Sequence, residues 1–142
     1  MTNKEYKKYA ERSVKKSPCI KNCICAFFIG GSISLIGQII VNIYFYFGFS
    51  LEDSFTLCCI TLIFLSAFFT ALGLYDKIAK YGGAGTLVPI TGFANAVVSP
   101  AIEFKNEGFI MGVGANMFKI AGPVIVFGVT ASVIGGLIFY LF

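Results

Sequence analysis

Amide side chains stand within stretches of this sequence that contain no charged residue. Gln38 and Asn42 lie four residues apart in the uncharged stretch 22–51, and Asn95 and Asn116 lie in two further apolar stretches. An amide has four hydrogen-bonding positions and is costly to bury without partners. Such residues either bond one helix to another or line a polar path, and the sequence leaves both interpretations open.

The few charged residues of the middle and second half border the uncharged stretches. Those predicted to lie at the mouths of such a path are Asp76, Lys77, Lys80, Glu103, Lys105, Glu107 and Lys119. Glu103 and Glu107 are neighbours if their segment is helical, so they can meet a cation or simply point into water. Lys105 and Lys119 can attract an anion, although Lys119 can equally mark the membrane boundary by snorkelling.

Composition argues against an enzyme. The chain of 142 residues has no His, which removes the commonest metal ligand and the commonest acid or base at neutral pH. Its five cysteines lack a second cluster at zinc-finger spacing and are best interpreted as small apolar residues. Gly83-Ala84-Gly85 lacks the third glycine of a nucleotide-binding motif. We therefore expect no catalytic site, cofactor, metal centre or nucleic-acid partner.

The overall composition is that of an integral membrane protein. The chain is 57% hydrophobic and 13% charged, whereas soluble domains carry about 25% charged residues. Residues 1–21 hold seven basic and two acidic residues and are expected to form a retained cytoplasmic tail. Residues 22–142 are expected to form a single, all-α-helical membrane domain that lies in the lipid bilayer.

Three stretches are long enough to cross a hydrocarbon core of about 30 Å, which needs about 20 apolar residues. We place these helices at about 24–47, 54–75 and 120–142, with the first two forming an antiparallel hairpin whose ends lie inside. Small residues recur at every fourth position on the first and last helices, which favours close helix packing. They are Gly30, Ser34, Gly128, Ser132 and Gly136.

The uncharged stretch 81–102 is irregular, because it contains four Gly and also Pro89 and Pro100. Proline removes a backbone hydrogen bond from a helix interior. Broken helices are tolerated at membrane depth only where protein or a watery cavity satisfies the freed backbone groups. The stretch either crosses as a third, irregular span or re-enters on one side. We favour about four crossings, with the loop 103–119 then outside.

Three blocks in the second half form an ordered set of motifs. They read GAGTLVPITGFAN at 83–95, EFKNEG at 103–108, and MFKIAG followed by VIVFG at 117–128. In this order they resemble the SpoVAC/SpoVAEB family of stage V sporulation proteins, and its AC branch more than its AEB branch. The likeness extends from about residue 22 to the C-terminus, and the N-terminal tail matches no pattern of the family.

The resemblance implies a protein of the spore (forespore) inner membrane in endospore-forming bacteria, with its N-terminus cytoplasmic. The family is associated with moving dipicolinic acid, as its calcium chelate, into the developing spore and out at germination. Its members are thought to form the membrane channel of a larger complex. The partners would be an AEB-type membrane paralogue and a soluble AD-type protein that closes the channel. The AC branch is also linked to opening under membrane tension.

Dipicolinate is an aromatic dianion, so a path for it needs hydrogen-bond donors and weak, multiple sites. The resemblance therefore implies that amide and hydroxyl groups, with exposed backbone N–H groups, line the path. These residues are Gln38, Asn42, Gly83, Gly85, Thr91, Asn95 and Asn116. Lys77, Lys80, Lys105 and Lys119 would draw the solute to the mouths of the path. Glu103 and Glu107 would meet calcium. The alternative is a non-conducting scaffold that docks the other subunits.

Overall fold

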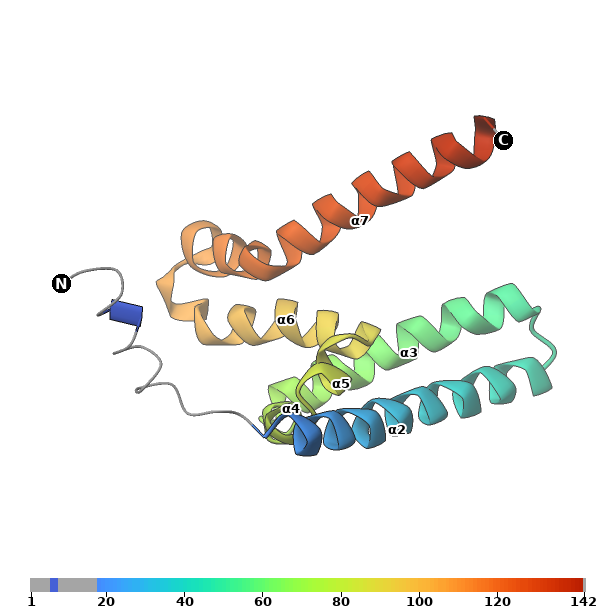
Figure 1. Cartoon of the computed structure of the whole chain (residues 1–142), viewed down its shortest axis with the longest axis horizontal. Helices are drawn as coiled ribbons and strands as arrows, with labels where there is room; N and C mark the ends of the chain where they lie inside the picture. The colour runs from blue at the N-terminus through green and yellow to red at the C-terminus, as the bar shows by residue number, and fades with distance from the viewer. Residues whose placement is uncertain (1–5, 8–17, 142) are drawn as a thin grey trace.

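Two long helices lie side by side and form an antiparallel hairpin (Figure 1). The structure is a computed structural model that describes residues 6–7 and 18–141. In it α2 covers Cys19–Tyr46 and α3 covers Leu51–Ala71. A third long helix, α7, covers Ala115–Leu141. These are the three described helices that are long and apolar enough to cross a membrane.

The turn of the hairpin is determined by local sequence. Gly48, two residues after the end of α2, has a φ of +91°, which residues with an L side chain rarely adopt. Ser50 then caps α3, because its hydroxyl oxygen accepts a 3.1 Å hydrogen bond from the Asp53 N–H. Glu52 and Asp53 lie in the first turn of α3, where negative charge is favoured by the helix dipole.

The two helices of the hairpin touch through small residues and two hydrogen bonds. Gly37 of α2 lies against Cys58 of α3, whose thiol donates to the Gly37 carbonyl oxygen at 3.3 Å. Nearer the turn, the hydroxyls of Tyr44 and Thr61 are 2.9 Å apart. Since Gly37 has no side chain, the backbones approach closely at this point.

Between α3 and α7 the chain is broken into short helices. α4 covers Tyr75–Gly82, α5 covers Ala84–Leu87 and α6 covers Ile90–Glu103. Gly83, with a φ of +48°, separates α4 from α5, and Pro89 separates α5 from α6. A 14-residue helix such as α6 is about 21 Å long, which is less than the hydrocarbon thickness.

The broken segment enters and leaves at the same end of the hairpin. α5 leads inward from the end where α2 begins, and α6 returns towards that end (Figure 1). The hydrogen bonds agree, because Ser66 reaches Thr91 and Thr70 reaches Asn95, so α6 runs parallel to α3. Our preference for a crossing at 81–102 is therefore wrong in this structure. The segment is re-entrant because Gly83 and Pro89 stop each helix before it spans.

The last helix starts at the inner end and runs to the opposite one. A short 3₁₀ turn at Lys105–Glu107 and a π-helical turn at Phe109–Gly114 lead into α7. The first turns of α7 lie on α6, whereas from Pro123 to Leu141 every residue is exposed and the helix diverges from the hairpin (Figure 1). The end of α7 at Leu141 consequently lies towards the end of the molecule that holds the α2–α3 turn.

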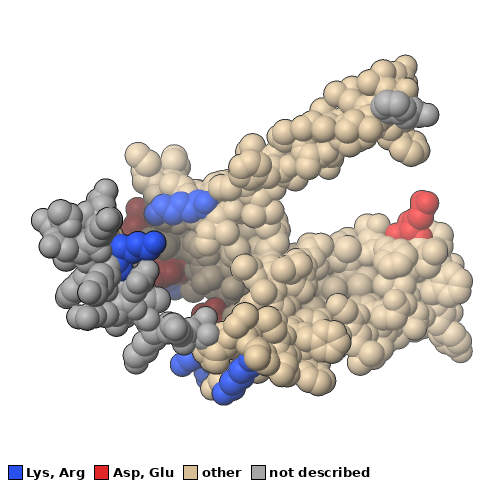
Figure 2. Space-filling view, in the orientation of Figure 1, with Lys and Arg blue, Asp and Glu red and all other residues tan. Residues whose placement is uncertain are grey.

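Basic residues gather at one end of the molecule, whereas acidic residues lie at both ends (Figure 2). The described lysines gather at the end with α4 and the start of α7, and Glu52 and Asp53 lie at the other end. A cytoplasmic excess of Lys and Arg sets the orientation of membrane helices. By this rule we expect the α4 end, and with it the loop 103–119, to lie on the cytoplasmic side.

The re-entrant arrangement can be tested by labelling. In a background without the native cysteines, Asn106→Cys should react with a membrane-impermeant thiol reagent from the side that holds the N-terminal tail. Phe49→Cys, at the α2–α3 turn, is the control and should react from the opposite side. Labelling of both positions from one side would mean that the segment crosses the membrane.

Candidate functional site

The backbone of the broken segment is held at membrane depth by a buried tyrosine. We call residues 84–92, from α5 to the first residues of α6, the re-entrant turn. Tyr75 of α4 is 6% exposed, and its hydroxyl donates a 2.9 Å hydrogen bond to the Thr86 carbonyl oxygen. The same hydroxyl lies 3.1 Å from that of Thr91. Because Pro89 ends α5, the Thr86 carbonyl lacks its helical donor, and Tyr75 supplies one.

Three side chains join α3 to α6 beside this tyrosine. The Ser66 hydroxyl donates to the Thr91 carbonyl oxygen at 2.6 Å. The Thr70 hydroxyl lies 2.7 Å from the Ser66 carbonyl oxygen and 2.8 Å from the Asn95 side-chain oxygen. Its single proton can go to only one of these, which leaves Asn95 with spare hydrogen-bonding capacity.

We call this group of side chains the polar cluster. It consists of Ser66, Thr70, Tyr75, Thr86, Thr91 and Asn95. All except Asn95 are buried, and Asn95 is half-buried. Buried hydroxyls with partners on both sides cost little, whereas a group that loses its partner carries the full cost of desolvation. The cluster therefore fixes the position of the re-entrant turn relative to α3.

Glycines allow the re-entrant turn to lie directly on its neighbours. A Cβ atom on Gly85 would overlap the carbonyl oxygen of Ala26 in α2, and one on Gly92 would overlap the Thr86 and Leu87 carbonyl oxygens. Gly30 of α2 lies against Gly85, and a Cβ there would be 3.1 Å from the Gly85 oxygen. The turn thus touches α2 through backbone atoms, with no side chains between.

An apolar cavity of about 150 Å³ lies behind the re-entrant turn. It is lined by Ile33 and Ile36 of α2, Leu62, Leu65, Ser66 and Phe69 of α3, Tyr75 and Ile78 of α4, and Thr91 of α6. Its polar lining residues, Ser66, Tyr75 and Thr91, all belong to the polar cluster. The cavity therefore adjoins the cluster and reaches the re-entrant turn at Thr91.

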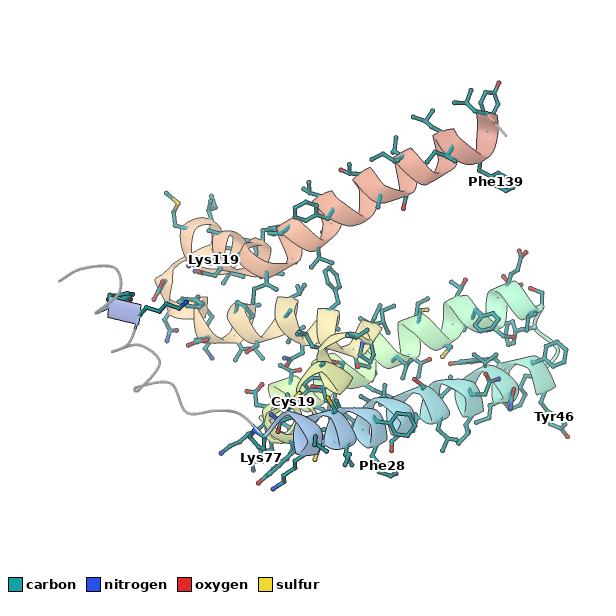
Figure 3. All side chains as sticks on the ribbon, in the orientation of Figure 1. Cys19, Phe28, Tyr46, Lys77, Lys119 and Phe139 are labelled. Carbon is teal, nitrogen blue, oxygen red and sulfur yellow. The ribbon has the colours of Figure 1, made fainter. Side chains whose placement is uncertain are left out.

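A second, more polar pocket of about 350 Å³ opens at the inner end, where α2 begins. It is lined by Cys19, Asn22, Cys23, Ala26, Lys80, Tyr81, Gly83 and Ala84. Lys77 and Lys119 lie at this end of the molecule in Figure 3, and the other charged residues predicted for the mouth are exposed as well. Lys80 therefore lines the same pocket as Gly83, the residue just before the re-entrant turn.

Three residues predicted for the solute path lie away from the polar cluster. Gln38 and Asn42 are exposed on α2, where the Gln38 amide donates to the Asn42 side-chain oxygen at 3.0 Å. Asn116 is buried, and its amide donates to the Gly112 carbonyl oxygen at 2.7 Å. Asn116 thereby bonds the π-helical turn to α7. Within one chain, these residues do not form one path with Thr91 and Asn95.

Of the small residues predicted for helix packing, one makes a contact within the chain and the others are exposed. Gly30 contacts Gly85, as described above, whereas Ser34 is exposed. Gly128, Ser132 and Gly136 are exposed on the diverging part of α7, and the Ser132 hydroxyl bonds back to the Gly128 carbonyl oxygen at 2.9 Å. Any helix that packs on this stripe must come from another molecule.

Comparison with known proteins gives the family. The model of the SpoVAC/SpoVAEB sporulation membrane protein family matches residues 22–138. The chain is also 46% identical to "Stage V sporulation protein AC" of Bacillus subtilis (strain 168), over 100% of this chain and 97% of that protein. The chain belongs to the SpoVAC/SpoVAEB family. The resemblance read from the motifs is confirmed, and no solved structure matches the chain.

Family membership bears on two features of the chain, its class and the location of its motif blocks. SpoVAC/SpoVAEB is a family of sporulation membrane proteins and not of enzymes, which agrees with the expectation from composition. The GAGTLVPITGFAN block at 83–95, which lies within the matched residues, contains the re-entrant turn. The predicted solute path included only Thr91 and Asn95 of the polar cluster, and the prediction missed Tyr75 and Thr86. Pro89, three residues after Thr86, was the available signal, because it frees a carbonyl group that needs a donor.

Replacing Gly85 tests the backbone contact between α5 and α2. Gly85→Ala should destabilise the folded protein by about 2 kcal/mol, because backbone atoms on both sides must move to admit the methyl group. Gly135→Ala is the control, since a Cβ there meets no atom within 4 Å. Unfolding of both variants in mixed micelles measures the difference. Equal stability of the two variants would contradict the contact.

Removing one hydroxyl tests the support of the re-entrant turn. Tyr75→Phe should lower the free energy of unfolding by about 1–3 kcal/mol, because the Thr86 carbonyl is left buried without a donor. Amide hydrogen exchange in residues 84–92 should become faster as well. Tyr81→Phe removes a hydroxyl from a side chain that is 70% exposed, and should change neither measurement. An unchanged exchange rate in Tyr75→Phe would rule out this support.

Proposed function

We propose that the protein is a membrane channel subunit of a spore complex that moves dipicolinic acid, as its calcium chelate, into the developing spore and out at germination. The observation that carries this proposal is the re-entrant turn with its polar cluster at membrane depth. Short, Gly- and Pro-interrupted segments of this kind are typical of binding regions in transport proteins. The family places the chain among sporulation membrane proteins, which supports the assignment to the spore inner membrane.

The chemistry of the turn suits an anionic solute. Dipicolinate needs hydrogen-bond donors to replace its water, and each must be weak enough to release it. Asn95 has spare hydrogen-bonding capacity, and Thr91 carries a hydroxyl beside it. The N–H groups of Ala84 and Gly85 have no backbone acceptor among the described residues. We therefore assign Gly83, Gly85, Thr91 and Asn95 to the solute path.

The charged inner end would serve as the mouth of the path. Lys80 lines the polar pocket that leads to Gly83, and Lys77, Lys105 and Lys119 lie exposed at the same end. Lysines around an opening raise the local concentration of an anion. Glu103 and Glu107 are the carboxylates available there for calcium, whose preferred ligands are oxygen atoms.

One chain of this size cannot enclose the path alone. Its three long helices leave the re-entrant turn with Leu87 and Val88 exposed, at 67% and 83%. Exposed turns at membrane depth require cover from protein. We propose that an AEB-type membrane paralogue supplies the other wall and that a soluble AD-type protein closes the inner mouth. Movement of the turn into the cavity behind it would open the path, and membrane tension would favour this movement.

A non-conducting scaffold is the second candidate. It is favoured by the outer half of α7, which diverges from the hairpin with every residue exposed from Pro123 to Leu141. Such a helix can bind another membrane subunit without taking part in conduction. In that case the charged inner end would dock soluble partners, and the polar cluster would serve only to hold the re-entrant turn.

Flux through reconstituted vesicles distinguishes the two candidates. Asn95→Leu should lower calcium dipicolinate flux at least about tenfold, since a hydrogen bond to a charged group contributes about 1.5–3 kcal/mol. Thr130→Val is the matched control, because that hydroxyl is exposed on α7 and bonds to its own helix. Both variants should still assemble with the partner subunits.

The opposite outcomes are equally specific. If no combination of subunits conducts, and removal of this chain prevents the others from assembling, the scaffold replaces the channel. If the Asn95→Leu and Thr130→Val proteins conduct equally, the path does not pass the polar cluster.

A further inference from the structure

One face of α2 points away from the rest of the chain and carries a regular pattern. The residues on it are spaced alternately by four and three positions, which is the heptad spacing of a helix that packs along a second helix. They are Ile24, Phe28, Gly31, Leu35, Gln38, Asn42 and Phe45, and all seven are exposed. We call this row the α2 seam. Phe28, which belongs to it, projects away from α3 in Figure 3.

The two amides of the α2 seam are incompletely bonded. Gln38 donates one N–H to the Asn42 side-chain oxygen, which leaves the Gln38 oxygen and its second N–H free, together with both N–H groups of Asn42. Gln38 lies about 12 Å inside the end of α2 at Tyr46, within the membrane-spanning length. Lipid chains offer no hydrogen-bond partners there, so another polar surface must meet these groups.

The remainder of the α2 seam has the shape of a helix contact. A surface hollow of about 230 Å³ lies over Gly31, bordered by Phe27, Phe28, Ser32 and Leu35. Because Gly31 has no neighbour within 4 Å, a side chain of a facing helix can fill this hollow as a knob fills a hole. Ser34, next to the seam, is also small enough for a close approach.

We propose that the α2 seam is the interface with a second copy of this chain, in a parallel pair of α2 helices. The lysines at the inner end give every copy the same orientation in the membrane, so two α2 helices meet in parallel. In such a pair each residue of the seam faces its own counterpart. Amides are self-complementary, because each has donors and an acceptor, and Asn at a heptad position sets register in parallel pairs.

This inference does not depend on the transport proposal. It replaces the prediction that Gln38 and Asn42 line the solute path, because amides that bond across the pair face a helix and not the solute. The re-entrant turn lies on the other side of α2, against Ala26 and Gly30. The pair therefore leaves the turn free for a different membrane subunit.

Cross-linking of the full chain in lipid vesicles tests the pair. In a background that lacks Cys19, Cys23, Cys25 and Cys59 but keeps the buried Cys58, Leu35→Cys should form a disulfide-linked dimer on oxidation. Ile43→Cys is the control for collision, because Ile43 is 47% exposed on α2 but lies outside the seam. The yield from Leu35→Cys should persist when the vesicles are diluted with lipid, whereas the yield from Ile43→Cys should fall.

The amides are tested in the same assay. The double variant Gln38→Leu with Asn42→Leu should weaken dimerisation at least about tenfold, measured as the lipid dilution that halves the dimer. Ser32→Ala should have no effect, since the Ser32 hydroxyl bonds to the Phe28 carbonyl oxygen of its own helix at 2.8 Å. Both amide replacements are apolar residues on an exposed face, and the helix content by circular dichroism should therefore stay unchanged.

Three results would overturn the inference. One is equal cross-linking at Leu35→Cys and Ile43→Cys. The second is undiminished dimerisation of the double amide variant. The third is a chain that stays monomeric alone and cross-links through Leu35→Cys only to a different membrane subunit, which would make the α2 seam the site of that subunit.

Discussion

Backbone N–H and C=O groups at membrane depth must find hydrogen-bond partners, and this constraint governs the second half of the chain. Gly83 and Pro89 interrupt the helix within a stretch that is otherwise apolar enough to lie in the membrane. The Thr86 carbonyl freed by Pro89 receives the Tyr75 hydroxyl. Ser66 then bonds the chain just beyond the break, at Thr91. The polar residues Ser66 of α3 and Tyr75 of α4 thus supply hydrogen bonds that the break at Pro89 removes from the chain that follows them.

The same constraint explains why one copy of the chain is incomplete. Tyr75, Ser66 and Thr70 satisfy the side of the re-entrant turn that faces the hairpin, whereas Leu87 and Val88 are exposed on its other side. α2 presents its amides outward, and α7 leaves the bundle after Pro123. We infer that an oligomeric or multi-subunit assembly would cover all three surfaces. Their chemistry differs, because the turn and α7 expose apolar side chains whereas α2 also exposes amides.

Residues four apart need not share a face over several turns, and the first helix illustrates this. Gly30, Ser34, Gln38 and Asn42 look like one stripe, but each step of four residues advances about 40° beyond a full turn. Gly30 therefore contacts Gly85, whereas Gln38 and Asn42 point outward. The short pattern correctly placed polar residues on a membrane helix. Their division between an internal contact and an external face needed the positions of α3 and α5.

The sequence alone determined the membrane class, the three long helices and the position of the breaks in the stretch 81–102. Hydropathy and the backbone conformations that Gly and Pro favour are local properties, so they can be read without the fold. The sequence also indicated the family, through motif blocks of which the first, at 83–95, contains the re-entrant turn. The direction in which the broken segment leaves the membrane was decided only by tertiary structure. The charges of the loop 103–119 balance, so no local term favours either side. The hydrogen bonds from Ser66 and Thr70 to α6, which depend on residues 25 positions apart, settle the direction.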